Sequence, residues 1–389
     1  MNDFKFFTPT RYIFGKDAQK NAGTLSKELL GERVLLVYGR DSAKSSGLLD
    51  QIEGYLQQSG IKYHEFGGIQ PNPTDRPVRA GISLCRDKEI TGLLAVGGGS
   101  VIDTAKAIAA GVLYDGDFWD FYSGKSIPKK ALPIGVVLTI PAAGSEGSGN
   151  SVITKEDGLR KVSIRTDYVL RPKFALLNPE LTFSLPPYQT ACGIVDMIAH
   201  ILERYFTPTE GADVSDRISE GIIKSIIEAA PVVMRNPDDY TARANIMWAG
   251  TLAHNGLCGC GKIEDWASHG LEHEISALYN VAHGAGLSVI LLAYMRYMLP
   301  IKPQRIADLG RSLFAADKET ETEAAKTAIE KFEEFFKSIG MPVNFAQLGI
   351  PDPDIELMVE KVHQNKGKVF GAYYPVTPDV SRAIYKLAL

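Results

Sequence analysis

The stretch that decides the fold is GLLAVGGGSVID, residues 92–103. Its first half is a short apolar run, which is typical of a fully buried strand. Its second half begins an apolar helix that continues through Ala105 and Ile108, and three consecutive glycines join the two. A strand that passes tightly into a helix is the repeating unit of a parallel sheet with crossover helices.

The flanking sequence repeats this alternation. Short β-rich runs of the same kind occur at residues 33–38, 62–66, 133–139 and 174–177. Helical patterns separate the first of them, as in the stretch that carries Leu48, Leu49, Ile52 and Leu56. The first part of the chain is therefore predicted to be a Rossmann-like α/β domain with a parallel sheet.

The pattern changes near Ser184. After Pro186 and Pro187, residues 188–206 have apolar side chains at a helical period, and helical patterns continue to the end of the chain. A chain of 389 residues is long enough for two domains. We predict an α/β domain over residues 1–183 and an all-helical domain over residues 184–389.

Composition excludes several classes of protein. The chain has 42 basic and 46 acidic residues, a net charge of −4, which gives no electrostatic reason to bind nucleic acid or an anionic membrane. It has no run of about 18 apolar residues and does not begin like a secretory signal. Its four cysteines are too few for a disulfide framework, so we expect a reducing, cytoplasmic location.

Two small-residue loops follow predicted strands. Glycines at 97–99 let the backbone approach a phosphate group, and the helix that starts there offers unpaired N–H groups to an anion. A plain tight turn is the alternative, because the run is neither G-x-G-x-x-G nor a P-loop. The second loop, PAAGSEGSG at 141–149, follows the strand that ends at Thr139 and is either part of the same cofactor site or a surface loop.

The helical half contains most of the seven histidines. Asp196 and His200 are four residues apart on one predicted helix, as are His269 and His273 on another (residues 264–277), and His283 follows. That spacing places both side chains on one helix face. One carboxylate with several imidazoles suits zinc or ferrous iron, whereas a satisfied polar pair with surface histidines is the alternative.

These loops and clusters, in this order, resemble the iron-containing alcohol dehydrogenase family, in particular its butanol dehydrogenase and broad aldehyde reductase branch. The resemblance covers essentially the whole chain. The stretches that carry it are TRYIFGKDA (10–18), GGGSVIDTAK (97–106), LTIPAAGSE (138–146), NPELTFSLP (178–186), VDMIAHILE (195–203) and DWASHGLEHEISALYNVAHGAG (265–286).

The resemblance implies a two-domain architecture like that of dehydroquinate synthase, a homodimer, and a role for each site residue. It makes Asp196, His200, His269 and His283 the ligands of one divalent ion, Fe²⁺ or Zn²⁺. It places His273 near the nicotinamide, where it is expected to help relay a proton. The expected cofactor contacts are Gly39, Asp41, Ser42, Gly97, Gly98, Gly99, Ser100, Asp103, Thr139, Ser145 and Lys161.

One departure from the branch concerns the choice of cofactor. After the first strand the branch usually reads Tyr-Gly-Gly-Gly-Ser, whereas this chain reads Tyr-Gly-Arg-Asp-Ser at 38–42. An acidic residue at the strand end binds the ribose hydroxyls of NAD, while a glycine near a cation accommodates the additional phosphate of NADP. Gly39 and Arg40 therefore favour NADP(H) over NAD(H), although Asp41 opposes it.

The expected reaction is hydride transfer between a nicotinamide and a primary alcohol or aldehyde, with the metal as Lewis acid on the substrate oxygen. The alternative within the same fold is a dehydroquinate-synthase-like or polyol-phosphate enzyme. Such substrates need clustered cations, and the sequence near Asp196 and His269 offers only Arg204 and Lys262. A non-catalytic binding module would leave the glycine loop and the histidine cluster unrelated.

Overall fold

The computed structural model describes residues 1–40 and 42–389. By internal contacts the chain divides into two compact units, Phe7–Ser184 and a second unit made of Met1–Phe6 with Leu185–Leu389. The assignment of domains to residues 1–183 and 184–389 stays a prediction.

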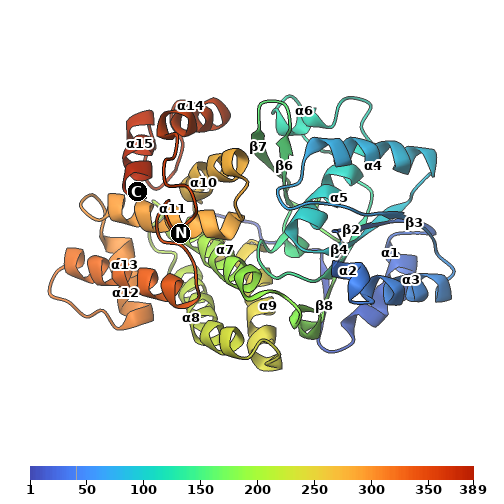
Figure 1. Ribbon diagram of the computed structural model, residues 1–389, viewed down its shortest axis with the longest axis horizontal. Coiled ribbons are helices and arrows are strands. Elements are labelled where there is room, and N and C mark those ends of the chain that lie inside the picture. Colours follow the sequence, from blue (N-terminus) through green and yellow to red (C-terminus); the bar gives the residue numbers. More distant parts are fainter. Residues whose placement is uncertain (41) are drawn as a thin grey trace. The chain divides into compact units, whose positions relative to one another are not determined.

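The unit Phe7–Ser184 is built around a parallel sheet. In the described part of the chain the sheet has six strands in the order β1-β8-β5-β4-β2-β3, and every neighbouring pair is parallel (Figure 1). The strands are β1 (Arg11–Phe14), β2 (Arg33–Tyr38), β3 (Lys62–Phe66), β4 (Gly92–Gly97), β5 (Ile134–Leu138) and β8 (Phe174–Leu177). The predicted Rossmann-like sheet is therefore confirmed.

Helices cover the sheet because its central strands are apolar on both faces. Val34 and Leu36 of β2 share a buried cluster with Ile52 and Leu56 of the helix α3. The alternate residues of β2 and β4 are buried as well, as parallel strands require. The helices of this unit are α1 (Ala22–Leu29), α2 (Ser42–Ser45), α3 (Leu48–Gln58), α4 (Asp75–Asp87), α5 (Gly99–Val112) and α6 (Trp119–Tyr122).

The strand order reverses between β2 and β4. From β2 the chain moves outward to β3, then returns across β2 to β4 and continues outward through β5 to β8. Such a switch point leaves a crevice at the carboxyl ends of the two central strands, where α/β proteins bind ligands. The glycine run follows β4 and Gly39 follows β2, so both lie at this switch point.

An antiparallel hairpin in this unit was not predicted. Its strands are β6 (Asn150–Lys155) and β7 (Arg160–Arg165), which pair from Asn150–Arg165 to Lys155–Arg160. The turn between them contains Asp157 and Gly158, and Gly158 has a φ of 79°. Asp-Gly between alternating residues is a hairpin signal, so the sequence did contain the information.

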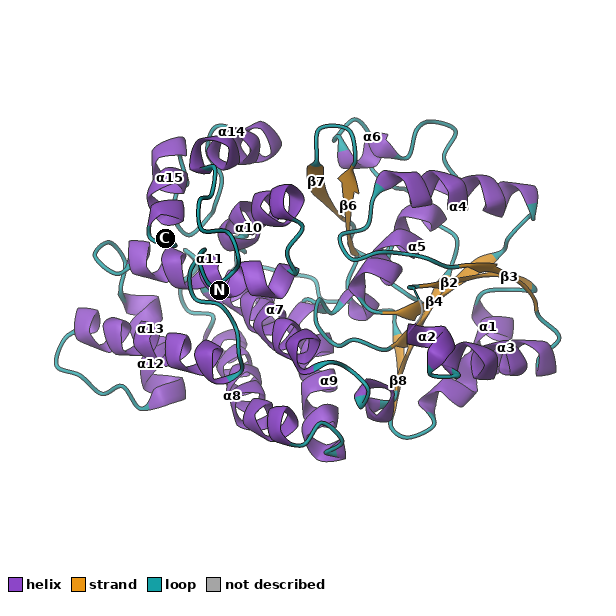
Figure 2. Ribbon diagram, in the orientation of Figure 1, coloured by secondary structure: helices purple, strands orange, loops and turns teal. Residues whose placement is uncertain are grey.

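The second unit is helical, and Figure 2 shows no strand in its described residues. Its helices are α7 (Pro187–Tyr205), α8 (Asp213–Arg235), α9 (Tyr240–His254), α10 (Ala267–Tyr279), α11 (His283–Met298), α12 (Gln304–Phe314), α13 (Glu321–Ser338), α14 (Ile355–Lys366) and α15 (Pro378–Lys386). The predicted all-helical half is confirmed.

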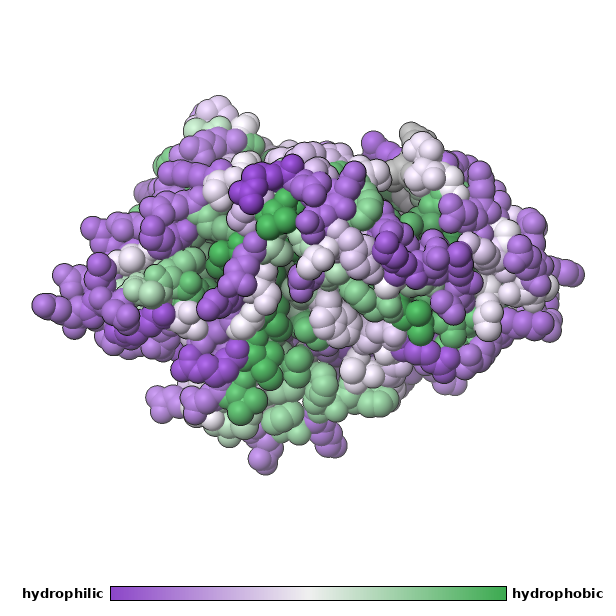
Figure 3. Space-filling view, turned by 90° about the horizontal axis from the view of Figure 1, so that it is seen from below, coloured by the Kyte–Doolittle hydropathy of each residue, from purple (hydrophilic) through white to green (hydrophobic). Residues whose placement is uncertain are grey.

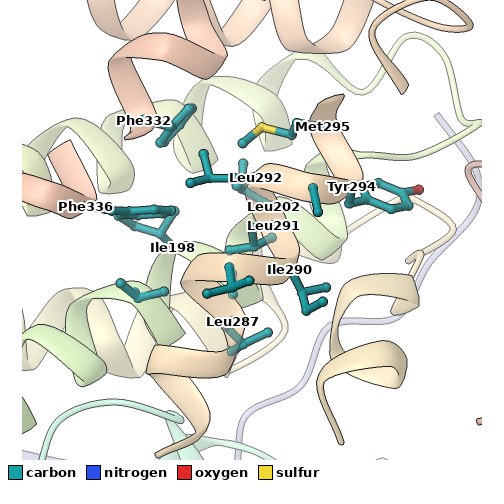
Figure 4. Close-up of a cluster of buried hydrophobic side chains, with 14 of the residues drawn as sticks. Ile198, Leu202, Leu287, Ile290, Leu291, Leu292, Tyr294, Met295, Phe332 and Phe336 are labelled. Atoms are coloured by element: carbon teal, nitrogen blue, oxygen red, sulfur yellow. The ribbon is translucent and has the colours of Figure 1, made fainter. Parts of the chain in front are cut away.

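The core of the helical unit forms where α7, α11 and α13 pack together. Ile198 of α7, Leu291 of α11 and Phe336 of α13 are fully buried in it (Figure 4). Burying each such side chain contributes roughly 1.5–3 kcal/mol, so this packing fixes α7 against α11. Both helices carry residues of the predicted metal cluster.

On the face seen in Figure 3, hydrophilic residues predominate and hydrophobic residues gather in patches among them. None of the described helices combines the length and the apolar character needed to cross a lipid bilayer.

Candidate metal centre and cofactor loops

Asp196 and His200 lie one turn apart on α7, and both are 5% exposed. The Nδ1 atom of His200 lies 2.9 Å from the carbonyl oxygen of Asp196 and 3.0 Å from its Oδ1. The i, i+4 spacing therefore brings the carboxylate and the imidazole together, as the helix geometry requires.

His269 and His283 reach Asp196 from two other helices. His269 lies in the first turn of α10, and His283 is the first residue of α11. Their Nε2 atoms both lie 3.9 Å from Oδ1 of Asp196. Two ligands on one zinc or iron ion lie about 3–4 Å apart, since each bond is roughly 2.0–2.2 Å long.

The four predicted ligands do not form one equally tight group. Donor atoms of Asp196, His200 and His269 lie within 4.8 Å of one another, whereas His283 forms a group of that size with Glu272 and His273. The link between the groups is the 3.9 Å separation of His283 Nε2 from Asp196 Oδ1. We regard Glu272 as the partner of His283, because it binds the opposite ring nitrogen.

Two buried carboxylates orient the imidazoles. Glu203 Oε1 lies 2.9 Å from Nδ1 of His269 and accepts a hydrogen bond from its backbone N–H at 2.7 Å. Glu272 contacts Nδ1 of His283 with one carboxylate oxygen and the hydroxyl of Ser276 with the other. Metal-ligating histidines are oriented in this way, because the carboxylate fixes the tautomer that leaves Nε2 for the ion.

The residues fit a divalent cation. Nε2 of His269 is buried and has no hydrogen-bond partner among the described residues, which is costly unless something else satisfies it. Burial and the neighbouring imidazoles hold the pKa of His269 well below its usual value, so the ring is in the neutral form that binds metals. Burial, together with the charge of Asp265, raises the pKa of Glu203 to about 8, and a nearby cation would favour the ionised form of this carboxyl.

His273 lies beside the cluster without belonging to the tightest group. It follows His269 by one turn of α10 and is 4% exposed. Its ring centroid lies 5.6 Å from that of His283 and 6.5 Å from that of His269. The position suits a group near the reacting atoms, and its role as a proton relay stays a prediction.

Sequence reasoning missed the residues that support the ligands. Glu203 follows Asp196 by seven residues and shares its helix face, and Glu272 follows His269 by three, so spacing could have identified both. The ring of His254, on α9, packs against that of His200, with the ring centroids 4.1 Å apart. This contact joins two helices and has no signal in the local sequence.

The glycine run is constrained by its neighbours. A Cβ atom on Gly98 would lie 2.9 Å from Cβ of Ile140, and one on Gly97 would lie 2.6 Å from Cγ2 of Val101. Gly98 is the N-cap of α5, and no side chain in the described structure caps this helix. The start of α5, with Ser100 in its first turn, has the helix N-terminal geometry that suits an anionic group, and binding of a pyrophosphate there stays a prediction.

The second loop is folded onto α5. The backbone N–H of Thr139 donates to the carbonyl of Gly97 at 3.1 Å, so the two loops begin side by side. Ser145 is buried, and its hydroxyl donates to Asp103 Oδ1 at 2.6 Å. Asp103 and Ser145 therefore bind each other, whereas direct contact of either one with a cofactor stays a prediction.

The remaining predicted cofactor residues lie in separate places. Lys161 is on β7, is buried, and donates to Oδ1 of Asn72 at 3.1 Å. Gly39 follows β2, and a Cβ atom there would have its nearest neighbours at 3.8 Å. Asp41 and the side chain of Ser42 lie outside the described residues.

Comparison with known proteins places this geometry in a family. Residues 9–179 match the family described as iron-containing alcohol dehydrogenase, and residues 190–389 match the C-terminal part of the Fe-containing alcohol dehydrogenase family. The chain is 41% identical to the probable NADH-dependent butanol dehydrogenase 2 of Bacillus subtilis and 38% identical to the NADPH-dependent aldehyde reductase YqhD of Escherichia coli. Each alignment covers 100% of both chains.

A solved structure agrees over the full length. The crystal structure of NADH-dependent butanol dehydrogenase A from Thermotoga maritima matches with a TM-score of 0.95 at 38% sequence identity, covering 100% of this chain and 99% of that chain.

A glycine loop at the switch point of a parallel sheet and a buried carboxylate–imidazole cluster define the class of metal-dependent, nicotinamide-coupled dehydrogenases. The chain belongs to the iron-containing alcohol dehydrogenase family. It is accordingly an oxidoreductase that acts on CH–OH groups with NAD(P) and a divalent metal ion.

Proposed function

We propose that this chain is an NADP(H)-preferring enzyme that interconverts primary alcohols and aldehydes, with butanol and butanal as representative substrates. The observation that carries the proposal is the approach of His269 Nε2 and His283 Nε2 to the same carboxylate oxygen of Asp196, each at 3.9 Å. The full-length relatives with butanol dehydrogenase and aldehyde reductase names support the substrate class.

Asp196, His200, His269 and His283 would hold the metal ion. When bound there, a divalent ion supplies Lewis acidity that stabilises negative charge on the substrate oxygen. Glu203 and Glu272 keep the ring nitrogens of two ligands in place, as their contacts with Nδ1 of His269 and of His283 support.

The other residues near the cluster would handle protons and exclude water. His273 is close enough to His283 to pass a proton toward the reacting oxygen or to receive one from it. Trp266 packs edge-on against the rings of His200 and His269, and the guanidinium of Arg204 lies 4.7 Å from the centre of its ring. These contacts shield the ligands from bulk water, which strengthens electrostatic interactions at the site.

The dinucleotide would bind at the switch point of the parallel sheet. The glycine run and the start of α5 suit its pyrophosphate, since backbone N–H groups and the helix dipole favour an anion there. Lys161, with its ammonium on the side chain of Asn72, is proposed to contact the nicotinamide ribose. The hydride chemistry belongs to the cofactor, and the protein positions it.

The preference for NADP(H) rests on the end of β2. Gly39 carries no carboxylate to bind the 2′-hydroxyl, and the exposed Arg40 follows it. Among the described residues, the atoms nearest to a Cβ added at Gly39 lie 3.8 Å away, so the change Gly39→Asp has room at the Cβ. It should shift the ratio of kcat/KM values for NADPH and NADH by about tenfold or more toward NADH.

We also propose a cytoplasmic homodimer. The four cysteines are thiols, which fits a reducing compartment. Exposed aromatic residues near the N-terminus, Phe4, Phe6 and Phe7, are apolar surface that a second copy could cover. Light scattering after size-exclusion chromatography tests the dimer, and a mass equal to one chain would contradict it.

One assay tests the proposed reaction. The purified protein, loaded with ferrous iron or zinc, is mixed with NADPH and butanal, and absorbance at 340 nm is followed. We expect oxidation of NADPH by the wild-type protein and none by His269→Ala, which should also lose its bound metal. A metal-free His269→Ala variant that turns over at the wild-type rate would refute the proposal.

A further inference from the structure

A buried lysine lies beneath the second small-residue loop. Lys106, on α5, is 0% exposed. Its ammonium donates to the carbonyl oxygens of Ser145 at 2.7 Å, Ser148 at 3.0 Å and Asn150 at 2.8 Å, and to the hydroxyl of Ser145 at 2.7 Å. All of these acceptors belong to one segment, so the loop backbone wraps around a single positive charge.

Asp103 completes the arrangement one turn earlier on α5. Its Oδ1 accepts from the hydroxyl of Ser145 at 2.6 Å, and its Oδ2 accepts from the backbone N–H of Val152 at 2.9 Å. The carbonyl oxygen of Asp103 accepts from the hydroxyl of Ser151 at 2.9 Å. Ser145 therefore lies between the carboxylate and the ammonium and bonds to both.

Burying the ammonium of Lys106 costs free energy. A buried charge is tolerated only when its hydrogen bonds are satisfied, and an ammonium has three donors, all of them used here. Burial lowers the pKa of Lys106 to about 8, which reflects the cost of keeping this charge out of water. An apolar side chain at 106 would remove the ammonium donor from three backbone carbonyls of residues 145–150, and the carbonyl of Ser145 would keep only the longer bond, 3.4 Å, from the backbone N–H of Ser148.

The segment held in this way borders the predicted dinucleotide site. α5 begins at the glycine run, and the loop follows β5, which pairs with β4 through Gly97 and Leu138. The carboxyl ends of these adjacent strands meet at the switch point, so the two loops share one edge of the sheet. Nothing in the assigned reaction explains why a charged pair should join them.

We propose that Lys106 and Asp103 are positioning residues for dinucleotide binding, because they clamp the loop 145–150 onto α5 and so preorganise both loops of the cofactor site. This inference rests on the proposed function. Asp103 and Ser145 then act through each other instead of touching the cofactor. A rigid loop binds more tightly because less conformational entropy is lost on binding.

The test compares Lys106→Met with a matched control, Lys262→Met. The side chain of Lys262 is also inaccessible, with its ammonium 2.6 Å from Asp216 Oδ1, but it lies in the helical unit. Dissociation constants for NADPH are measured by isothermal titration calorimetry, together with melting temperature, metal content and kcat at saturating NADPH.

We expect Lys106→Met to bind NADPH about tenfold more weakly or worse, because the loop must then be ordered when the dinucleotide binds. Its metal content should stay at the wild-type value and its kcat should change little. Lys262→Met should melt earlier but bind NADPH normally. Wild-type affinity in Lys106→Met, or equal weakening in both variants, would overturn the inference.

A second, milder variant keeps the inference testable if Lys106→Met does not fold. Ser145→Ala removes only the hydroxyl that joins Asp103 to Lys106, and it should weaken NADPH binding about threefold to tenfold. Unchanged affinity would overturn the clamp. A wild-type protein that binds neither NADPH nor NADH would overturn the clamp and the proposed function together.

Discussion

At the scale of single residues, the chemistry of the site depends on the group that contacts Nδ1 of each imidazole, because Nε2 is the nitrogen left for the ion. Burial lowers the pKa of His269, which favours the neutral ring. The contact between its Nδ1 and Glu203 Oε1 fixes the orientation of that ring. The sequence predicted the histidine from its spacing but not the carboxylate, because glutamate at a helix position is usually a solvated residue. Only the packing shows that Glu203 is 2% exposed.

The first prediction concerns Glu203. The change Glu203→Gln keeps the size of the side chain but replaces the carboxyl group that contacts His269, so metal affinity should fall about 10–100-fold. Equilibrium dialysis against ferrous iron or zinc measures it. Glu264→Gln is the control, because the Glu264 carboxylate accepts hydrogen bonds from Arg204 at 3.0 Å and from the indole of Trp266 at 2.8 Å. Equal metal affinity in wild type and Glu203→Gln would contradict the prediction.

The second prediction concerns pH and follows from Lys106. Burial lowers its pKa from 10.5 to about 8, while Asp103 and Glu146 raise it and Arg171 lowers it further. As the pH rises through about 8 the ammonium loses its proton, and a neutral amine donates only two hydrogen bonds. The dissociation constant for NADPH should therefore be constant below pH 7 and rise above pH 8.

Lys106 should affect folding stability in the opposite direction, because its contribution to the free energy of unfolding rises with pH while the affinity for NADPH falls. The unfolded chain keeps this proton up to about pH 10.5, so between pH 8 and 10.5 the unfolded state binds more protons and this residue alone favours the native state as pH rises. Calorimetric titration with NADPH measures the first pH dependence and unfolding experiments measure the second. Lys106→Met should show neither of them. A flat wild-type binding profile between pH 7 and 9.5 would argue against a charged Lys106 in the clamp.

At the scale of elements, the ligands are positioned by the close approach of α7 and α11. Gly284 follows His283, and a Cβ atom there would lie 2.0 Å from the carbonyl oxygen of Cys192, one turn before Asp196. Only glycine permits this crossing distance. The glycine in AHGAG therefore determines how close His283 comes to Asp196.

The third prediction is that Gly284→Ala separates these helices. It should destabilise the protein by about 1–3 kcal/mol through overpacking and should also weaken metal binding. Thermal unfolding and metal titration measure the two effects. Gly221→Ala on α8 is the control: it has open space around it and should stabilise the helix by about 0.5–1 kcal/mol without affecting metal. Normal metal affinity in Gly284→Ala would contradict this account.

Hydrophobic periodicity predicted the bounds of an element correctly where the segment is a single short apolar or alternating run. The strands at 33–38, 62–66 and 174–177 have the bounds that were predicted. The helix predicted from residue 264 begins at Ala267 instead, because its N-cap, Trp266, has a φ of 65°, a left-handed conformation that an α-helix does not contain. This backbone conformation is held by the tertiary contacts of the Trp266 ring, and helix propensities, which describe local sequence, do not contain that information.

At the scale of the whole molecule, the fold class and the order of the two kinds of structure were predictable from the sequence. Alternation of strand and helix patterns gives way to helical patterns after residue 184, and in the structure β8 ends at Leu177 and α7 begins at Pro187. The strand order was not predictable from periodicity, since β1 at the sheet edge pairs with β8 across about 160 residues of chain. The long-range strand pairings could not be predicted from periodicity, whereas the spacing of Glu203 and Glu272 could have marked them as candidates and the structure showed what they contact.

The fourth prediction concerns metal removal from the intact protein. A ligand that binds only the folded state at 100–1,000 times its dissociation constant adds about 3–4 kcal/mol of stability. Chelation should therefore lower the melting temperature by roughly 5–15 °C, and added ferrous iron or zinc should restore it. A melting temperature that chelator leaves unchanged, in protein shown to have lost its metal, would contradict a cation that neutralises this buried cluster.

The central claim is that Asp196, His200, His269 and His283 bind one catalytic cation. Anomalous diffraction from crystals of the metal-loaded protein, recorded on both sides of the metal's absorption edge, tests it most directly. We predict a single peak in contact with Oδ1 of Asp196 and with the imidazoles of the three histidines. A peak elsewhere, or no peak in crystals whose dissolved protein is fully active, would contradict the account.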